Sequence, residues 1–204
     1  MIYCGNFGKT GVFGLALFIT NRPPRRETGI EKIQGLCKLQ KLVYLSIALH
    51  PIKKLENFGC LKNLKHLAIN NSKISKLENL SKLTSLENLL VNGGIKKIEG
   101  IKSLTKLRDL NLYGNQLTSM DGVEKSPNLR RLLLTRNKIQ HITHLESLHK
   151  LELLWLNENP LKDTSGLRYY PKMKDFEITG FKEDPIVKKL THREKKIRHE
   201  IYEI

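Results

Sequence analysis

The most constraining feature of the sequence is a leucine spacing that recurs in six consecutive copies between Leu42 and Lys172. Five copies are 22 residues long, and the copy that begins at Leu86 is 21 residues long. The spacing reads L-x-x-L-x-L-x-x-N-x-I-x-x-I-x-x-L-x-x-L. Its first part alternates with a period of two, as a strand does, and its second part repeats every three residues, as a 3₁₀ or turn-rich segment does.

A single copy cannot bury its own leucines, so the copies must stack and share one core. The spacing therefore predicts a right-handed solenoid of the α/β class. Its strands form a parallel sheet on the concave side, and its 3₁₀ and turn-rich segments return along the convex side. At 204 residues and with 39% hydrophobic residues, the chain is long enough to bury such a core.

The copies resemble leucine-rich repeats of the 22-residue class. The segments "KKIEGI", "KLENL" and "LWLNENPL" are similar to those of the leucine-rich regulators of type 1 protein phosphatase, and the bacterial internalins have a similar pattern. The resemblance covers residues 30–172, which we take as the repeat region. It implies a concave surface that uses aromatic and acidic residues to bind a protein partner.

The corner after each strand normally carries an asparagine that hydrogen-bonds backbone groups of the adjacent coil. Asn115, Asn137 and Asn159 fill this position in the last three copies. The first three copies instead hold His50, Ser72 and Gly94. We therefore expect a more irregular N-terminal half.

Residues 1–29 are expected to form an N-terminal cap or first coil with an inserted basic loop, "NRPPRRET". Val12, Leu15 and Leu17 are spaced like the strand leucines. The preceding "GNFGKTG" is interpreted as a turn. The alternative is a phosphate-binding loop, but Tyr3 stands where G-x-x-x-x-G-K-[ST] requires glycine.

Residues 173–204 are expected to contain a final strand, Met173-Phe176-Ile178, and a C-terminal capping helix. Asp184 and Pro185 are typical N-cap and first-turn residues. The apolar residues that follow at helical spacing are Ile186, Leu190, Ile197, Ile201 and Ile204. The alternative for this helix is a role in binding a partner or a membrane surface.

The formal net charge of +16 suggests an acidic partner such as nucleic acid or an anionic surface. Many repeat lysines fall on the return loops, however, and no aromatic residues are interleaved with them as a stacking platform for bases. Nucleic-acid binding is therefore kept as an alternative. No window approaches the roughly twenty apolar residues of a membrane span.

Cys4, Cys37 and Cys60 are an odd number of cysteines without C-x-x-C spacing. They argue against a disulfide framework or a zinc site and favour a reducing compartment. A cytoplasmic location is therefore expected. A secreted protein is the alternative, because Lys9 and the apolar stretch after it have the shape of a signal peptide.

The sequence contains no catalytic motif, so we expect no enzyme activity and no cofactor. The segment "HITHLESLH" holds three histidines and Glu146, which makes it a candidate metal site. Histidines three residues apart converge only on a helical turn, whereas this segment lies in a return loop. No metal is therefore expected.

The strand residues that alternate with the leucines should face the concave surface, the usual interaction site of such solenoids. In the C-terminal half these residues form an apolar and aromatic patch edged by charges, which is typical of protein interfaces. The candidate partner-binding residues are Asp109, Tyr113, Arg131, Leu133, Arg136, Leu153, Trp155, Asn157 and Glu158. The resemblance implies an acidic residue where Leu153 stands.

These patterns predict a monomeric module that binds a partner protein through the C-terminal half of its concave face, as a regulatory subunit or scaffold. One alternative is a basic adaptor that contacts nucleic acid or an anionic surface. The other is a secreted, internalin-like adhesion repeat.

Overall fold

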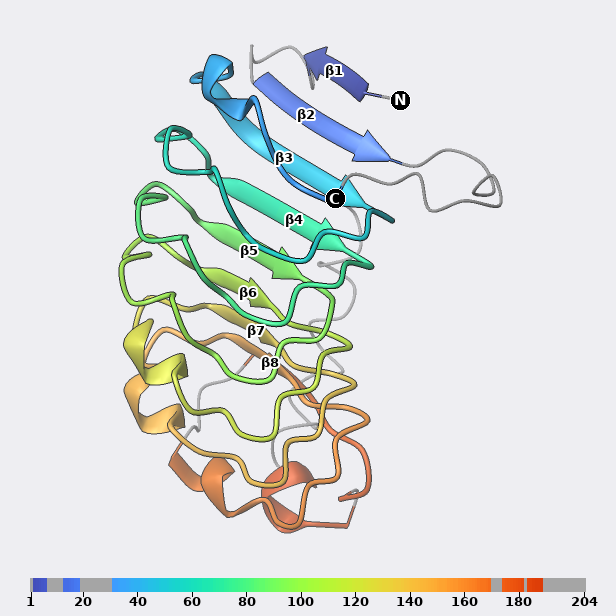
Figure 1. The fold of residues 1–204 in the computed structure, drawn as a ribbon. Coiled ribbons are helices and arrows are strands. Elements are labelled where there is room, and N and C mark those ends of the chain that lie inside the picture. Colours follow the sequence, from blue (N-terminus) through green and yellow to red (C-terminus); the bar gives the residue numbers. More distant parts are fainter. Residues whose placement is uncertain (1, 7–12, 19–30, 170–173, 182, 189–204) are drawn as a thin grey trace, which may run out of the picture.

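The structure is a computed structural model that describes residues 2–6, 13–18, 31–169, 174–181 and 183–188. The described chain forms a curved solenoid in which nine strands make one sheet in chain order (Figure 1). The first two strands are antiparallel, and each later strand is parallel to the strand before it. The strands are β1 (Ile2–Asn6), β2 (Phe13–Phe18), β3 (Leu42–Ala48), β4 (His66–Asn70), β5 (Asn88–Val91), β6 (Asp109–Asn111), β7 (Arg131–Leu133), β8 (Leu153–Trp155) and β9 (Asp175–Glu177). The predicted solenoid with a parallel sheet is confirmed.

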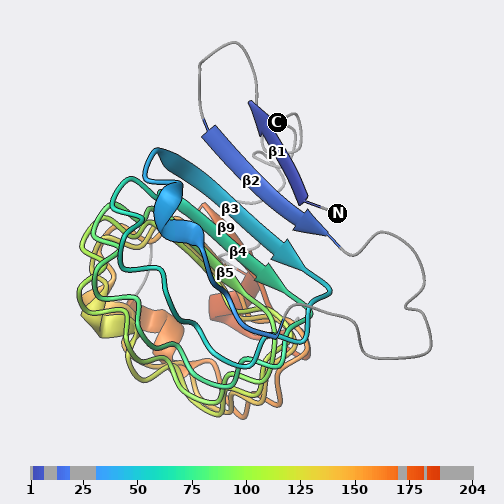
Figure 2. The same cartoon turned by 45° about the horizontal axis from the view of Figure 1, so that its top comes forward.

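The alternation of leucines decides which face of each strand is buried. Leu45, Leu67 and Leu89 are in register on β3, β4 and β5, and each is at most 1% exposed. Burying one leucine side chain contributes roughly 1.5–3 kcal/mol, and these three leucines belong to one core that is shared between coils. Figure 2 shows the strands on one side of the solenoid and the return segments on the other.

The return segments contain short 3₁₀ helices, as the period of three predicts. They are η1 (Leu36–Lys38), η2 (Val123–Lys125), η3 (Leu145–Ser147) and η4 (Ser165–Tyr169). The residue before η2 is Gly122, with φ of 106°, and the residue before η3 is His144, with φ of 65°. Each of these two helices is therefore preceded by a residue in the left-handed backbone conformation.

One position of the return segment brings successive coils into close contact. In the second copy it holds Asn79, whose amide donates to the carbonyl oxygen of Leu55 in the preceding coil at 2.8 Å. In the fourth copy it holds Gly122, where an added Cβ would lie 1.9 Å from the carbonyl oxygen of Ile98. In most copies the position therefore holds either an amide that bonds the neighbouring carbonyl or a residue without a side chain. The fifth copy instead holds His144, whose ring contacts Asp121 of the preceding coil.

The predicted asparagines hold the strand corners together. Asn137 Nδ2 donates to the carbonyl oxygens of Leu112 and Leu134, both at 2.9 Å, and its Oδ1 accepts from Leu117 N at 3.0 Å. The bonds to Leu112 and Leu117 cross to the preceding coil. The equivalent side chains are Asn115 and Asn159.

The expected irregularity of the N-terminal copies is not found in the sheet. The pairings from β3 to β5 contain no register shift, and these strands are longer than β6 to β9. Two side chains replace part of the missing asparagine contacts. Ser72 Oγ accepts from Ile74 N at 3.3 Å and donates to Asn92 O at 3.0 Å, while Asn92 Nδ2 donates to Tyr113 O at 2.8 Å.

The N-terminal strands extend the sheet beyond the repeats. β2 pairs in parallel with β3, and this register places Leu15 beside Leu45 and Leu17 beside Ile47. β1 then pairs antiparallel with β2 and closes this end of the sheet as a hairpin. Most of the predicted "GNFGKTG" turn, Val12 and the "NRPPRRET" loop lie outside the described residues.

The C-terminal end adds β9, which contains the expected Phe176, while Met173 lies outside the described residues. Asp184 acts as the predicted N-cap: its Oδ1 accepts from Ile186 N at 2.8 Å, and residues 185–188 begin a helical turn. The rest of the predicted capping helix lies outside the described residues. No helix in the described part of the chain is long and apolar enough to cross a membrane.

The expectation of no disulfide framework is wrong, because Cys37 and Cys60 form a disulfide. They are 23 residues apart, close to one repeat length, and their Cα atoms are 5.2 Å apart. Stacking of adjacent coils therefore brings together two cysteines whose spacing matches no local motif. The disulfide links the first described coil to the next.

Replacement of Asn137 by Ala should lower the free energy of unfolding by about 3 kcal/mol, because several buried backbone groups lose their partner. The matched control is Asn128→Ala, which removes only exposed contacts with Thr105 and Lys150 and should lower it by less than about 1 kcal/mol. Denaturant unfolding followed by circular dichroism measures both values. Equal losses in the two variants would contradict the structural role of Asn137.

Reduction of the disulfide should lower the free energy of unfolding by about 2–4 kcal/mol, because the unfolded chain loses a constraint. The double variant Cys37→Ser/Cys60→Ser should show the same loss and should not respond to reductant. Unfolding midpoints with and without reductant test this expectation. It fails if reductant destabilises the double variant as much as the wild-type chain.

Candidate functional site

The concave face of the sheet holds a groove of about 400 Å³. The groove exists because the strand side chains that alternate with the buried leucines point away from the core, and the curved sheet surrounds them. Five of the residues predicted from the sequence line it: Asp109, Arg131, Leu133, Leu153 and Trp155.

The groove also extends further toward the N terminus than the predicted surface. Tyr44 on β3 and His66 on β4 belong to its lining, with ring centroids 6.0 Å apart. Both residues occupy the same repeat position in adjacent copies. This recurrence of ring side chains is the sequence signal that could have predicted their place in the groove. Asn88 and Leu90 continue the lining on β5.

Arg131 and Asp109 form a bidentate ion pair between β7 and β6. Arg131 Nε and Nη2 donate to the two carboxylate oxygens at 2.7 and 2.5 Å, and Asn88 also donates to Asp109. This hydrogen bonding to Asp109 raises the pKa of Arg131. The two predicted charges therefore offset each other, and the guanidinium is held in a fixed position.

The apolar part of the groove lies on β7 and β8. Leu133 and Trp155 are register partners on these strands, and both are half-buried. Leu153 is only 7% exposed, so it forms the floor of the groove. A partly exposed indole beside leucines on a rigid sheet has the composition of an interface anchor.

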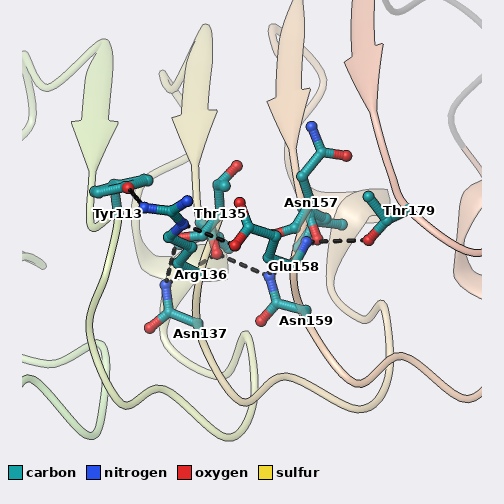
Figure 3. Close-up of polar contacts among 10 residues, drawn as sticks. Tyr113, Thr135, Arg136, Asn137, Asn157, Glu158, Asn159 and Thr179 are labelled. Carbon is teal, nitrogen blue, oxygen red and sulfur yellow. Dashed lines mark hydrogen bonds and ion pairs between the residues drawn. The ribbon is translucent and has the colours of Figure 1, made fainter.

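Tyr113, Arg136 and Glu158 form a second group, where the chain leaves the strands (Figure 3). Arg136 Nε donates to Glu158 Oε2 at 2.7 Å, while Nη1 donates to the Tyr113 hydroxyl. The guanidinium also lies 5.5 Å from the centroid of the Tyr113 ring. Bonding to Glu158 raises the pKa of Arg136, so a fixed charged cluster borders this edge of the concave face.

Two carboxylates on β9 were not among the predicted site residues. Asp175 is the register partner of Leu153, and Glu177 is the register partner of Trp155. Asn157, a predicted residue, donates from Nδ2 to Glu177 Oε2 at 2.7 Å. The alternation around Phe176 in the expected final strand was the signal that could have placed both carboxylates on the concave face.

Three buried polar atoms in this half of the concave face have no hydrogen-bond partner among the described residues. They are Thr135 Oγ1, Trp155 Nε1 and Asp175 Oδ1, and we call their residues the concave polar row. They come from three successive coils. A fourth such atom, Ser126 Oγ, lies in a return segment. Unpaired buried polar atoms are uncommon in folded proteins and lower stability unless a partner supplies the missing bond.

The histidines considered for metal binding contact carboxylates in different coils. His141 Nδ1 lies 3.0 Å from Asp163 in the following coil, and His144 Nε2 lies 2.9 Å from Asp121 in the preceding coil. The contact with His144 is the main cause that lowers the pKa of Asp121. Within the described ranges, no group of three His, Cys, Asp or Glu side chains could hold a metal ion.

No protein-family model matches the chain. Over 82 residues it is 28% identical to a homolog of the protein phosphatase 1 regulatory inhibitor subunit PPP1R7 from Arabidopsis thaliana, covering 40% of this chain and 25% of the relative. Over 78 residues it is 38% identical to leucine-rich repeat-containing protein 23 from Xenopus tropicalis, covering 36% of this chain and 22% of the relative. The matched region is thus a quarter or less of the length of these relatives.

Among solved structures, an internalin (inlF) from Listeria monocytogenes superposes with a TM-score of 0.67 at 27% sequence identity. The match covers 74% of this chain and 45% of the internalin. The curated relatives and this likeness agree with the repeat spacing and the parallel sheet. The chain is therefore a leucine-rich-repeat protein, and it resembles regulators of protein phosphatase 1.

Proposed function

We propose that the chain is a non-enzymatic interaction module that binds a partner protein in the C-terminal half of its concave groove. The observation that carries this proposal is the concave polar row beside the apolar residues Leu133 and Leu153. Each unpaired buried polar atom disfavours the unbound state by roughly 1–3 kcal/mol. A partner that supplies matching donors and acceptors removes this penalty while it covers the apolar surface.

The geometry of the sheet favours such binding. The core fixes the strand positions, and the Arg131–Asp109 and Arg136–Glu158 pairs fix the charged side chains around the groove. Little conformational freedom is therefore lost when a partner docks. The unpaired atoms are covered in the free protein, so binding involves small side-chain shifts, which are common at interfaces.

The relatives suggest a role as a regulatory subunit or scaffold inside the cell. The name of the Arabidopsis relative identifies it as a regulatory inhibitor subunit of protein phosphatase 1. The resemblance implies an acidic concave residue where this chain has Leu153. Asp175, the register partner of Leu153 in the next coil, supplies a carboxylate one strand away. We therefore propose a phosphatase as one candidate partner.

A secreted adhesion repeat is the second candidate, and one observation favours it. The Cys37–Cys60 disulfide is typical of oxidising compartments, and the structure superposes on an internalin. Trapping of free thiols in intact cells, followed by mass spectrometry, separates the two candidates. An oxidised Cys37–Cys60 pair in cells supports secretion, and a reduced pair supports the intracellular regulator.

Substitution of Trp155 by Phe tests the groove with little change in shape. The variant removes the unpaired indole N–H and keeps most of the apolar area, so the free energy of unfolding should stay equal or rise slightly. Binding to the partner should weaken on the order of tenfold, because the partner loses one hydrogen bond to a buried donor. Asp175→Asn should weaken binding to a similar extent.

The assay begins with capture of partners from a cell lysate by the full chain, followed by calorimetric titration of the strongest partner. The matched control is Thr118→Ala, an exposed substitution on a return segment away from the groove. The control should bind as the wild-type chain does. Binding that is unchanged in Trp155→Phe and Asp175→Asn would refute the concave site, and so would binding that is lost in the control.

A further inference from the structure

Positive charge is concentrated in the N-terminal coils of the solenoid. Residues 31–106 contain 14 Lys, no Arg and no Asp, and 5 Glu, which gives a formal charge of 14 − 5 = +9. Residues 107–169 contain 9 Lys or Arg and 7 Asp or Glu, which gives 9 − 7 = +2. The two segments are similar in length, so the difference in formal charge shows that the basic residues are distributed unevenly along the solenoid.

These lysines are available to a ligand. All 14 are exposed. Among the described residues only two of them form ion pairs, Lys53 with Glu31 at 3.5 Å and Lys65 with Glu87 at 3.2 Å. Surface pairs of this kind contribute little and are screened by salt, so they do not remove the positive potential.

The segments that follow β3, β4 and β5 lie side by side along one edge of the solenoid (Figure 1), and six of the lysines belong to these segments. We call them the lysine edge: Lys53, Lys54, Lys73, Lys76, Lys96 and Lys97. The backbone of this edge is joined across coils, since Lys73 N donates to Ile52 O at 2.8 Å and Gly94 N donates to Ile74 O at 2.7 Å. Adjacent strands are about 4.8 Å apart, so the six side chains can act on one ligand.

The lysine edge is separate from the concave groove. None of its residues lines the groove, which is formed by the alternate residues of the strands. Three carboxylates lie close to it in sequence, Glu56, Glu78 and Glu99, and a fourth, Glu31, pairs with Lys53. Six lysines against four glutamates leave a local charge of 6 − 4 = +2. In the next coil, Thr118 and Ser119 take the positions of Lys96 and Lys97, so the edge ends there.

We propose that the lysine edge binds the phosphate backbone of a nucleic-acid duplex without reading its sequence. Lysine is a point charge that suits phosphate contacts, whereas base recognition favours the planar fork of arginine, which these coils lack. No aromatic residue belongs to the edge, so it offers no stacking platform for single strands.

The other candidate ligands fit the lysine edge less well than a duplex does. Protein interfaces are depleted in lysine, which disfavours a protein partner. Stable membrane attachment requires apolar insertion as well, and among described residues 31–106 the only exposed large apolar side chain is Leu49.

The test is fluorescence anisotropy with a labelled random-sequence DNA duplex of about 24 base pairs, measured over a range of salt concentrations. The edge variant is Lys54→Glu/Lys76→Glu/Lys97→Glu, which changes one equivalent position in each coil. The control variant is Lys125→Glu/Lys150→Glu/Arg168→Glu, which changes the net charge equally at exposed sites of the C-terminal coils that do not occupy the repeat positions of the lysine edge. A Lys→Gln version of the edge variant, with circular dichroism of all proteins, confirms that folding is retained.

The wild-type chain should bind with a Kd on the order of 10⁻⁶–10⁻⁴ M at physiological salt, and its affinity should fall steeply as salt rises. The edge variant should bind more than tenfold more weakly and lose about two to three units of the log–log salt slope, since about 0.9 unit is lost per phosphate contact. The control variant should weaken binding less than about threefold.

Equal weakening by both triple variants would overturn the proposal, because net charge alone would then explain binding. It is also overturned if the duplex does not bind. Vesicles containing phosphatidylserine and polyglutamate serve as alternative polyanions. If either binds through the edge more tightly than the duplex does, a membrane or an acidic protein segment is the ligand instead. Trp155→Phe should bind the duplex normally, so this test stands apart from that of the concave site.

Discussion

Satisfaction of backbone groups where each strand turns into its return segment is the constraint on which the rest of the structure depends. At these corners a coil can be buried against its neighbour only if the carbonyl and N–H groups of both are paired. Asn137 meets this requirement with bonds to its own coil and to the preceding one, and Asn115 and Asn159 act in the same way. The leucine columns then stack at the spacing of a sheet. Without this pairing, burial of the leucines would leave polar groups unsatisfied.

Periodic features of the fold could be predicted from the sequence, because the same residue type at the same repeat position has the same neighbours. The leucine columns, the corner asparagines and the last strand around Phe176 belong to this class. The Cys37–Cys60 disulfide was not predicted, since its residues become neighbours only through stacking. The positions of Leu133 and Trp155 in the groove could be predicted, because buried and concave-facing residues alternate along each strand. The neutralisation of Arg131 by Asp109 depends on side-chain conformations, which the spacing does not determine.

The proposals divide the solenoid into two functional parts. The concave groove presents hydrogen-bonding and apolar groups in fixed positions, which favours a partner of defined shape. The lysine edge presents exposed charges, which favour a regular polyanion and a broad range of sequences. The two surfaces use different residues of the coils, the alternate strand residues in one case and the segments after the strands in the other. A single rigid sheet could therefore hold a protein and a nucleic acid at the same time.

The linear order of the sheet also determines how the molecule can come apart. Each described strand pairs only with the strands before and after it in the chain, so no strand pairing within the described residues joins distant coils. Mechanical force or thermal fraying must therefore peel coils from an end rather than open the middle. The Cys37–Cys60 crosslink sits near one end and ties the first described coil to the second. In oxidising surroundings the solenoid thus has a preferred direction of unravelling, from the C-terminal coils, and reduction removes that preference.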